Sequence, residues 1–134
     1  MAKEQKNGSL GREAILGFLS QDPASKRRRV DVPEWGGAVY VNVLTGPRYR
    51  EWLDARAPLF ADDARPDPLN NQRIQALFLV FAVTDEQGAP LFQPDDVEMM
   101  VAVPLDQQGI LLRIGDAAAD INGLKVPTQA LGKS

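Results

Sequence analysis

Residues 32–44 read Val32-Pro33-Glu34-Trp35-Gly36-Gly37-Ala38-Val39-Tyr40-Val41-Asn42-Val43-Leu44, and this stretch decides the fold. Its centre is the pair Gly36-Gly37, which can supply the positive φ angles of a tight two-residue hairpin turn. Valines alternate with other residues downstream, as in a strand with one buried face. Pro33 cannot donate a hydrogen bond to a neighbouring strand, so the first arm is predicted to be an edge strand. We therefore predict a two-stranded β-hairpin over residues 30–44.

A lone hairpin is only marginally stable in water, so helices are expected to cover one of its faces. Apolar residues recur at helical spacing in five segments. These segments are residues 9–20 with Ser9 as the N-cap, 45–57, 72–84, a short helix from Pro94, and a last helix from Pro104 to about Ile121. Helix 72–84 is apolar nearly all round, which is typical of a helix inside a small domain or under an oligomer contact.

The predicted fold is mainly α with a β-hairpin (α+β), a small single domain of about five helices around an N-terminal two-stranded hairpin. We place this domain at residues 9–123, with Asn122-Gly123 as the final helix stop. Residues 1–8 are predicted to be disordered and residues 124–134 to form a flexible C-terminal tail. A chain of 134 residues with 44% hydrophobic and 25% charged residues fits one soluble globular domain.

The charge is divided unevenly along the chain. Residues 1–29 hold seven Lys/Arg and three Asp/Glu, a net charge of +4, whereas residues 30–134 hold eight and fifteen, a net charge of −7. The segment Lys26-Arg27-Arg28-Arg29 is either a patch for phosphate or an acidic partner, or a solvated basic linker. The acidic body argues against a domain that reads nucleic-acid sequence.

The composition also bears on chemistry and on the cellular setting. The chain contains no Cys and no His, which excludes thiolate chemistry and the commonest general base. The adjacent carboxylates Asp62-Asp63 and Asp95-Asp96 are interpreted as loop charges and as helix N-terminal charges, not as metal ligands. We therefore predict no catalytic, cofactor or metal site. The first twenty residues lack the apolar core of a signal peptide, and no apolar run is long enough to span a membrane, so a cytoplasmic location is expected.

Three blocks of sequence together resemble one protein family. The first is Val32-Pro33-Glu34-Trp35-Gly36-Gly37-x-Val39-Tyr40-Val41 with Leu44-Thr45-Gly46 and Tyr49. The second is Leu79-x-Phe81-Ala82-Val83-Thr84-Asp85-Glu86-Gln87-Gly88-x-Pro90-Leu91-Phe92 with Pro94-x-Asp96-Val97, and the third is Ile121-Asn122-Gly123-Leu124. In this order they are similar to the tail assembly chaperones of long-tailed, lambda-type siphovirus bacteriophages. The likeness covers roughly residues 9–124.

This resemblance implies a non-enzymatic protein with a mostly helical fold. Such chaperones hold the long tape measure protein in solution, recruit major tail protein, and leave before the tail is complete, so they are absent from the mature virion. In many such phages a programmed ribosomal frameshift adds a C-terminal extension, and the tail from Leu124 suits such a junction. The resemblance places the protein in the host cytoplasm.

A tape measure protein is long, helical and partly apolar, so a chaperone that self-associates in an open spiral could present a repeated apolar groove to it. Candidate contacts for this self-association are helix 72–84 and the edge hairpin. Candidate partner-binding residues are the aromatic side chains Trp35, Tyr40, Tyr49 and Trp52 and the basic side chains Arg27, Arg28 and Arg29. The four aromatic residues equally suit the core of a chain this short.

Two other classes of function remain open at this point. One is a small head–tail or nucleic-acid-binding accessory module that uses the basic segment 26–29. The other is an adaptor or inhibitor domain with the same fold and an unrelated partner.

Overall fold

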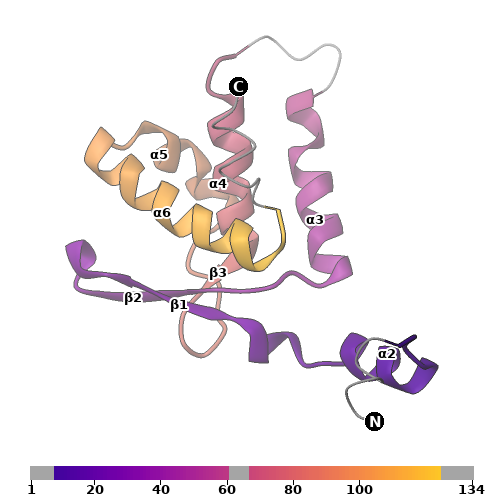
Figure 1. Cartoon of the computed structure of the whole chain (residues 1–134). Helices are drawn as coiled ribbons and strands as arrows, with labels where there is room; N and C mark the ends of the chain where they lie inside the picture. Colours follow the sequence, from indigo (N-terminus) through magenta and orange to yellow (C-terminus); the bar gives the residue numbers. More distant parts are fainter. Residues whose placement is uncertain (1–7, 61–66, 125–134) are drawn as a thin grey trace, which may run out of the picture.

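The computed structural model describes residues 8–60 and 67–124, and Figure 1 shows their arrangement. The described residues form five α-helices and three strands. In chain order these are α2 (Arg12–Leu19), β1 (Arg28–Val32), β2 (Gly37–Val41), α3 (Gly46–Arg56), α4 (Asn70–Ala82), β3 (Val83–Thr84), α5 (Val97–Ala102) and α6 (Leu105–Ile121). The predicted α+β class with about five helices is confirmed. The predicted ends of the chain at 1–7 and 125–134, and the pair Asp62-Asp63, lie outside the described residues.

The sheet has three antiparallel strands in the order β1-β2-β3, and not the two that were predicted. Val30 lies opposite Val39 in the hairpin, and Val41 lies opposite Val83 across the second pairing. The end of the predicted helix 72–84 therefore forms β3. Asn42 explains why α4 ends at Ala82 and a strand follows. Its Nδ2 donates to the Ala82 carbonyl oxygen and to Thr84 Oγ1, both at 2.9 Å.

The hairpin connection differs from the predicted two-residue turn. Pro33–Trp35 form one 3-10 turn between the strands, and Gly36 closes it with φ of 81° while its N–H donates to the Pro33 carbonyl oxygen. Gly37 already belongs to β2, opposite Val32. The hairpin thus occupies residues 28–41 instead of 30–44. The sequence interpretation was wrong because proline fixes its own φ near the helical value and favours a turn at this position.

We expect the two glycines of this turn to respond differently to alanine. Gly36→Ala should destabilise the protein by about 1–2 kcal/mol, because an L-residue is strained in the left-handed region. Gly37→Ala should change stability by less than about 0.5 kcal/mol, because Gly37 has an ordinary strand conformation and a Cβ there would meet no atom within 4 Å. Urea unfolding of both variants checks this pair. Equal effects would contradict the turn described here.

The helices α3 to α6 lie on one side of the sheet (Figure 1). Helix α6 contacts both β1 and β2, and α4 packs against α3, α5 and α6. The most deeply buried side chains come from the sheet, α5 and α6: Val32, Val41, Val83, Met100 and Ile114. The alternation predicted downstream of the turn is seen in β2, where Val39 and Val41 are both buried.

Polar contacts fix both ends of α6 to the rest of the domain. At its C-terminal end, Asn122 Oδ1 accepts from the Leu44 N–H at 2.8 Å, and Asn122 Nδ2 donates to the Asn42 carbonyl oxygen at 3.0 Å. Gly123 follows with φ of 72°, which confirms the predicted helix stop. At the N-terminal side, Gln108 Nε2 donates to the carbonyl oxygen of Val101 at 2.8 Å and thereby ties α6 to the end of α5.

An ion pair joins the hairpin turn to α6. Arg113 donates from two guanidinium nitrogens to the two carboxylate oxygens of Glu34, at 3.0 and 2.8 Å. These hydrogen bonds lower the pKa of Glu34 from 4.5 to about 2. Because the pKa in the folded state lies below that of the unfolded chain, the pair stabilises the fold above pH 4.5 and loses this contribution as the pH falls towards 2.

Replacing Glu34 with glutamine should therefore weaken the fold slightly at neutral pH and flatten the fall in stability between pH 4.5 and about 2. Urea midpoints measured across that interval test this expectation. Arg113→Gln should give the same flattening, since it removes the other partner. An unchanged slope in both variants would show that the pair does not form.

Helix α2 stands apart from the rest of the domain. Its N-cap is Gly11 and not the predicted Ser9, and none of its residues is buried. In Figure 1 it lies beyond the start of β1, away from α4 and α6. In the described ranges, no helix has both the length and the apolar character needed to cross a membrane.

Candidate functional site

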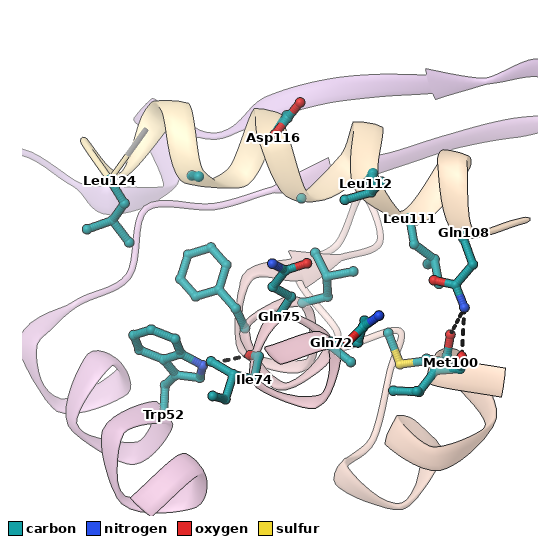
Figure 2. A pocket seen from close by; sticks show the side chains of 16 residues that line it. Trp52, Gln72, Ile74, Gln75, Met100, Gln108, Leu111, Leu112, Asp116 and Leu124 are labelled. Atoms are coloured by element: carbon teal, nitrogen blue, oxygen red, sulfur yellow. Dashed lines mark hydrogen bonds between the residues drawn. The ribbon is translucent and has the colours of Figure 1, made fainter. Parts of the chain in front are cut away.

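An apolar groove runs along α6. It has a volume of about 350 Å³ and lies where α3, α4, α5 and α6 approach one another (Figure 2). Its lining is mostly aliphatic and aromatic: Trp52, Gln72, Ile74, Gln75, Ala76, Phe78, Leu79, Met100, Val101, Gln108, Leu111, Leu112, Gly115, Asp116, Ala119 and Leu124. We refer to this surface as the α6 groove.

The α6 groove exists because α6 carries two apolar stripes. Residues four apart lie on one face of a helix. The first stripe, Ile110-Ile114-Ala118, is buried against the rest of the domain. The second, Leu111-Gly115-Ala119, is turned towards α4 and lines the groove. Two of its three side chains are very small, so α6 lies close to α4 here, and a Cβ at Gly115 would be in ordinary van der Waals contact with Leu79 Cδ2 at 3.8 Å.

Trp52 forms the part of the groove that comes from α3. Its ring packs edge-on against Phe78 at 5.2 Å between centroids, and its Nε1 donates to the Ile74 carbonyl oxygen at 3.4 Å. The Arg56 guanidinium lies over the other side of the ring, 4.5 Å from the centroid. Trp52 is thus held rigidly, which makes it a preorganised apolar wall.

The polar side chains of the lining suit binding better than chemistry. They are three glutamines and one carboxylate, Gln72, Gln75, Gln108 and Asp116. Gln72 and Gln75 are exposed on α4, where their amides can meet the polar groups of a bound chain. Within residues 8–60 and 67–124, no group of three or more acidic residues is placed to hold a metal ion. The pair Asp95-Asp96 has a structural role, since Asp96 Oδ2 accepts from the Gln93 N–H at 2.8 Å.

The structure does not bring the four predicted aromatic residues together in one surface. Trp52 is buried and lines the α6 groove, and the exposed Tyr49 lies beside it, with the two rings tilted by 44° and their centroids 5.6 Å apart. Trp35 is 42% exposed in the hairpin turn and donates from Nε1 to Gln107 Oε1 at 2.8 Å. Tyr40 is half-buried in β2 beneath Arg27, whose guanidinium lies 4.4 Å from the ring centroid.

The predicted basic segment is likewise divided among separate contacts. Arg27 Nη1 donates to the Glu86 carbonyl oxygen at 2.6 Å. Arg28 forms an ion pair with Asp120 of α6 at 3.1 Å, and Arg29 forms one with Asp31 at 2.9 Å. Arg27 and Arg28 therefore tie the start of β1 to its neighbours, whereas Arg29 pairs within β1, and the three side chains do not form one free basic patch.

The three sequence blocks of the resemblance map onto turns and helix ends. Thr45 Oγ1 accepts from the Arg48 N–H at the start of α3. Asp85 Oδ1 accepts from the N–H groups of Gln87 and Ala89, both at 2.9 Å, and so shapes the turn after β3. Asn122 closes α6 as described above. Residues of these blocks thus shape turns and helix ends, while the α6 groove is lined largely by other residues.

Sequence reasoning missed the groove residues of α6. The regular spacing of Leu111, Gly115 and Ala119 was a usable signal, because a second apolar stripe on a helix needs a second partner. Small residues at helical spacing also mark a place where something can approach closely.

Comparison with solved structures gives a distant likeness. No family model matches the chain, and no curated protein matches it. A solved structure described as that of the bacteriophage HK97 tail assembly chaperone is similar to this chain, with a TM-score of 0.47 and 17% sequence identity. The alignment covers 83% of this chain and 95% of that one. At this identity and TM-score the likeness carries no argument about function, which has to come from the residues themselves.

Proposed function

We propose that this chain is a tail assembly chaperone of the lambda-type siphovirus kind, which binds the tape measure protein and keeps it soluble during tail assembly. The observation that carries this proposal is the α6 groove, an open apolar surface without catalytic groups. The sequence blocks that resemble this family support it independently.

The α6 groove suits one face of an amphipathic helix. Its α6 wall from Gln108 to Ala119 extends over eleven residue steps, or about 17 Å, enough for about three turns of a bound helix. Helices bind such grooves through apolar side chains spaced three and four apart. Leu111 and Leu112 on one wall and Trp52 on another would contact those side chains, and the glutamines of α4 would meet the polar edge of the helix.

The wider role follows from the resemblance of the sequence blocks. The protein would be non-enzymatic, would act in the host cytoplasm, would recruit major tail protein to the coated tape measure protein, and would be absent from the mature virion. Trp35 and Tyr49, both partly exposed and outside the lining of the groove, remain candidates for contacts with major tail protein.

Co-expression of the chain with the tape measure protein of the same phage tests the proposal. The tape measure protein should be found mainly in the pellet when it is expressed alone, and in the soluble fraction, bound to the chaperone, when both are expressed. A second, unrelated helical protein that aggregates serves as the specificity control. A tape measure protein that stays in the pellet in the presence of the chain would contradict the proposal.

A further inference from the structure

The α6 groove presents apolar side chains that the described part of the chain leaves open to solvent. Leu112 on its rim is 57% exposed and Leu124 is 47% exposed, and both line the groove. In Figure 2, Leu124 lies at the C-terminal end of α6 and Gln108 lies at the opposite end of the groove. Exposed apolar side chains gathered in this way mark a surface that takes an occupant.

The end of α6 turns the chain back towards this groove. Gly123 has φ of 72°, its N–H donates to the Asp120 carbonyl oxygen at 3.1 Å, and the Leu124 N–H donates to the Ala119 carbonyl oxygen at 2.8 Å. These two hydrogen bonds form a Schellman motif, which ends the helix and commonly packs the residue after the glycine against the last turn. Ala119 and Leu124 both line the groove. The chain therefore leaves the described fold at the groove itself.

Residues 125–134, which follow Leu124 in the sequence, have the composition and the length of an occupant. Their apolar side chains include Val126, Ala130 and Leu131. Pro127 favours an extended conformation at the residue before it. An extended chain covers about 3.3 Å per residue, so the seven steps from Leu124 to Leu131 can cover up to about 23 Å. This reach exceeds the length of the α6 wall, about 17 Å.

Charge and tethering favour this segment as the occupant. Residues 125–134 hold two Lys and no acidic residue, a net charge of +2, whereas residues 30–124 hold six Lys/Arg and fifteen Asp/Glu, a net charge of −9. Asp116 lines the groove and forms no salt bridge within residues 8–60 and 67–124, so its carboxylate is available to a lysine. Because the segment is joined to the groove, its effective concentration there is on the order of millimolar, and weak contacts are enough to hold it.

We infer that residues 125–134 fold back into the α6 groove of their own chain and compete there with a bound helix. Val126 and Leu131 take the place that apolar side chains of a partner helix would take. A free copy thus keeps its groove covered until a helix of the tape measure protein displaces the segment. Only the identity of this displacing helix rests on the proposed function.

Labelling of a single cysteine tests whether the segment covers the groove. The chain has no Cys, so Ala119→Cys places one thiol in the lining. Adding Leu131→Asp should make this thiol react with N-ethylmaleimide about tenfold faster, because a carboxylate is unfavourable in an apolar groove and the segment then leaves it open. Ser134→Asp is the matched control, with the same added charge at a polar position, and should leave the rate unchanged. The thiol of Leu105→Cys, outside the groove, should react equally fast with and without Leu131→Asp.

Three results would overturn the inference. The first is a labelling rate of Ala119→Cys that Leu131→Asp does not change. The second is an equal rise in rate with Ser134→Asp, which would show a general effect of charge. The third is protection of the thiol that appears only as the protein concentration rises, which would place the segment in the groove of another copy. Far-UV circular dichroism verifies that every variant is folded.

Co-expression with the tape measure protein separates this inference from the proposed function. Leu131→Asp should keep the tape measure protein soluble at a lower ratio of chaperone to tape measure protein than the wild type, because its competitor is weakened. If Leu131→Asp leaves the labelling rate unchanged while the tape measure protein is kept soluble, the inference fails and the proposed function stands. If Leu131→Asp raises the labelling rate but no variant keeps the tape measure protein soluble, the proposed function fails and the internal contact stands.

Discussion

Replacing Ile114 with alanine should lower the free energy of unfolding by about 2–5 kcal/mol. Ile114 lies in the middle of α6 and is 0% exposed, and α6 contacts both β1 and β2. The substitution removes buried methyl and methylene groups and leaves a cavity that the surrounding side chains fill only in part. Since small domains have a total stability of about 5–15 kcal/mol, a loss of this size leaves a markedly weakened protein.

Urea unfolding at one low protein concentration measures this effect. The control is Leu112→Ala on the same helix, two residues away, where the side chain is 57% exposed and the loss should stay below about 1 kcal/mol. Equal losses in both variants, or no loss in Ile114→Ala, would contradict the packing of α6 against the sheet.

The alternation in residues 32–44 was enough to predict the hairpin, because strand alternation is a local property of the sequence. The third strand was not predictable in this way. Val83 and Thr84 continue the apolar run of α4, and what turns them into a strand is Asn42, forty residues earlier in the chain, whose amide bonds to Ala82 and Thr84. A contact at that distance leaves no trace in a local pattern.

The candidate site could likewise not be predicted from local sequence patterns alone. Arg27, Arg28 and Arg29 are neighbours in sequence and were grouped as one patch, but each has a different partner, on the turn after β3, on α6 and within β1. The α6 groove was missed because its width depends on which helices face Leu111, Gly115 and Ala119. Residue spacing predicts which side chains share a face, whereas the identity of the facing element comes only from the tertiary fold.

Leu112→Asp should abolish the ability of the chain to keep the tape measure protein soluble. Leu112 lies on the rim of the α6 groove, where a bound helix would cover it. An unpaired carboxylate buried there costs several kcal/mol, which corresponds to a loss of binding of a hundredfold or more. Asp116 lies one helical turn away and adds repulsion to the new charge.

Leu105→Asp is the matched control for this change. It puts the same charge on the same helix, but Leu105 is 88% exposed, lies outside the groove and is the first residue of α6, where a carboxylate is favourable. Both replaced side chains are more than half exposed, so both variants should fold, and far-UV circular dichroism verifies this.

The most direct measurement is the soluble fraction of tape measure protein co-expressed with Leu112→Asp, set against the fraction obtained with Leu105→Asp. The groove hypothesis predicts that Leu112→Asp leaves the tape measure protein in the pellet, as if no chaperone were present, and that Leu105→Asp keeps it soluble like the wild type. Equal soluble fractions with two folded variants would show that the α6 groove does not bind the tape measure protein.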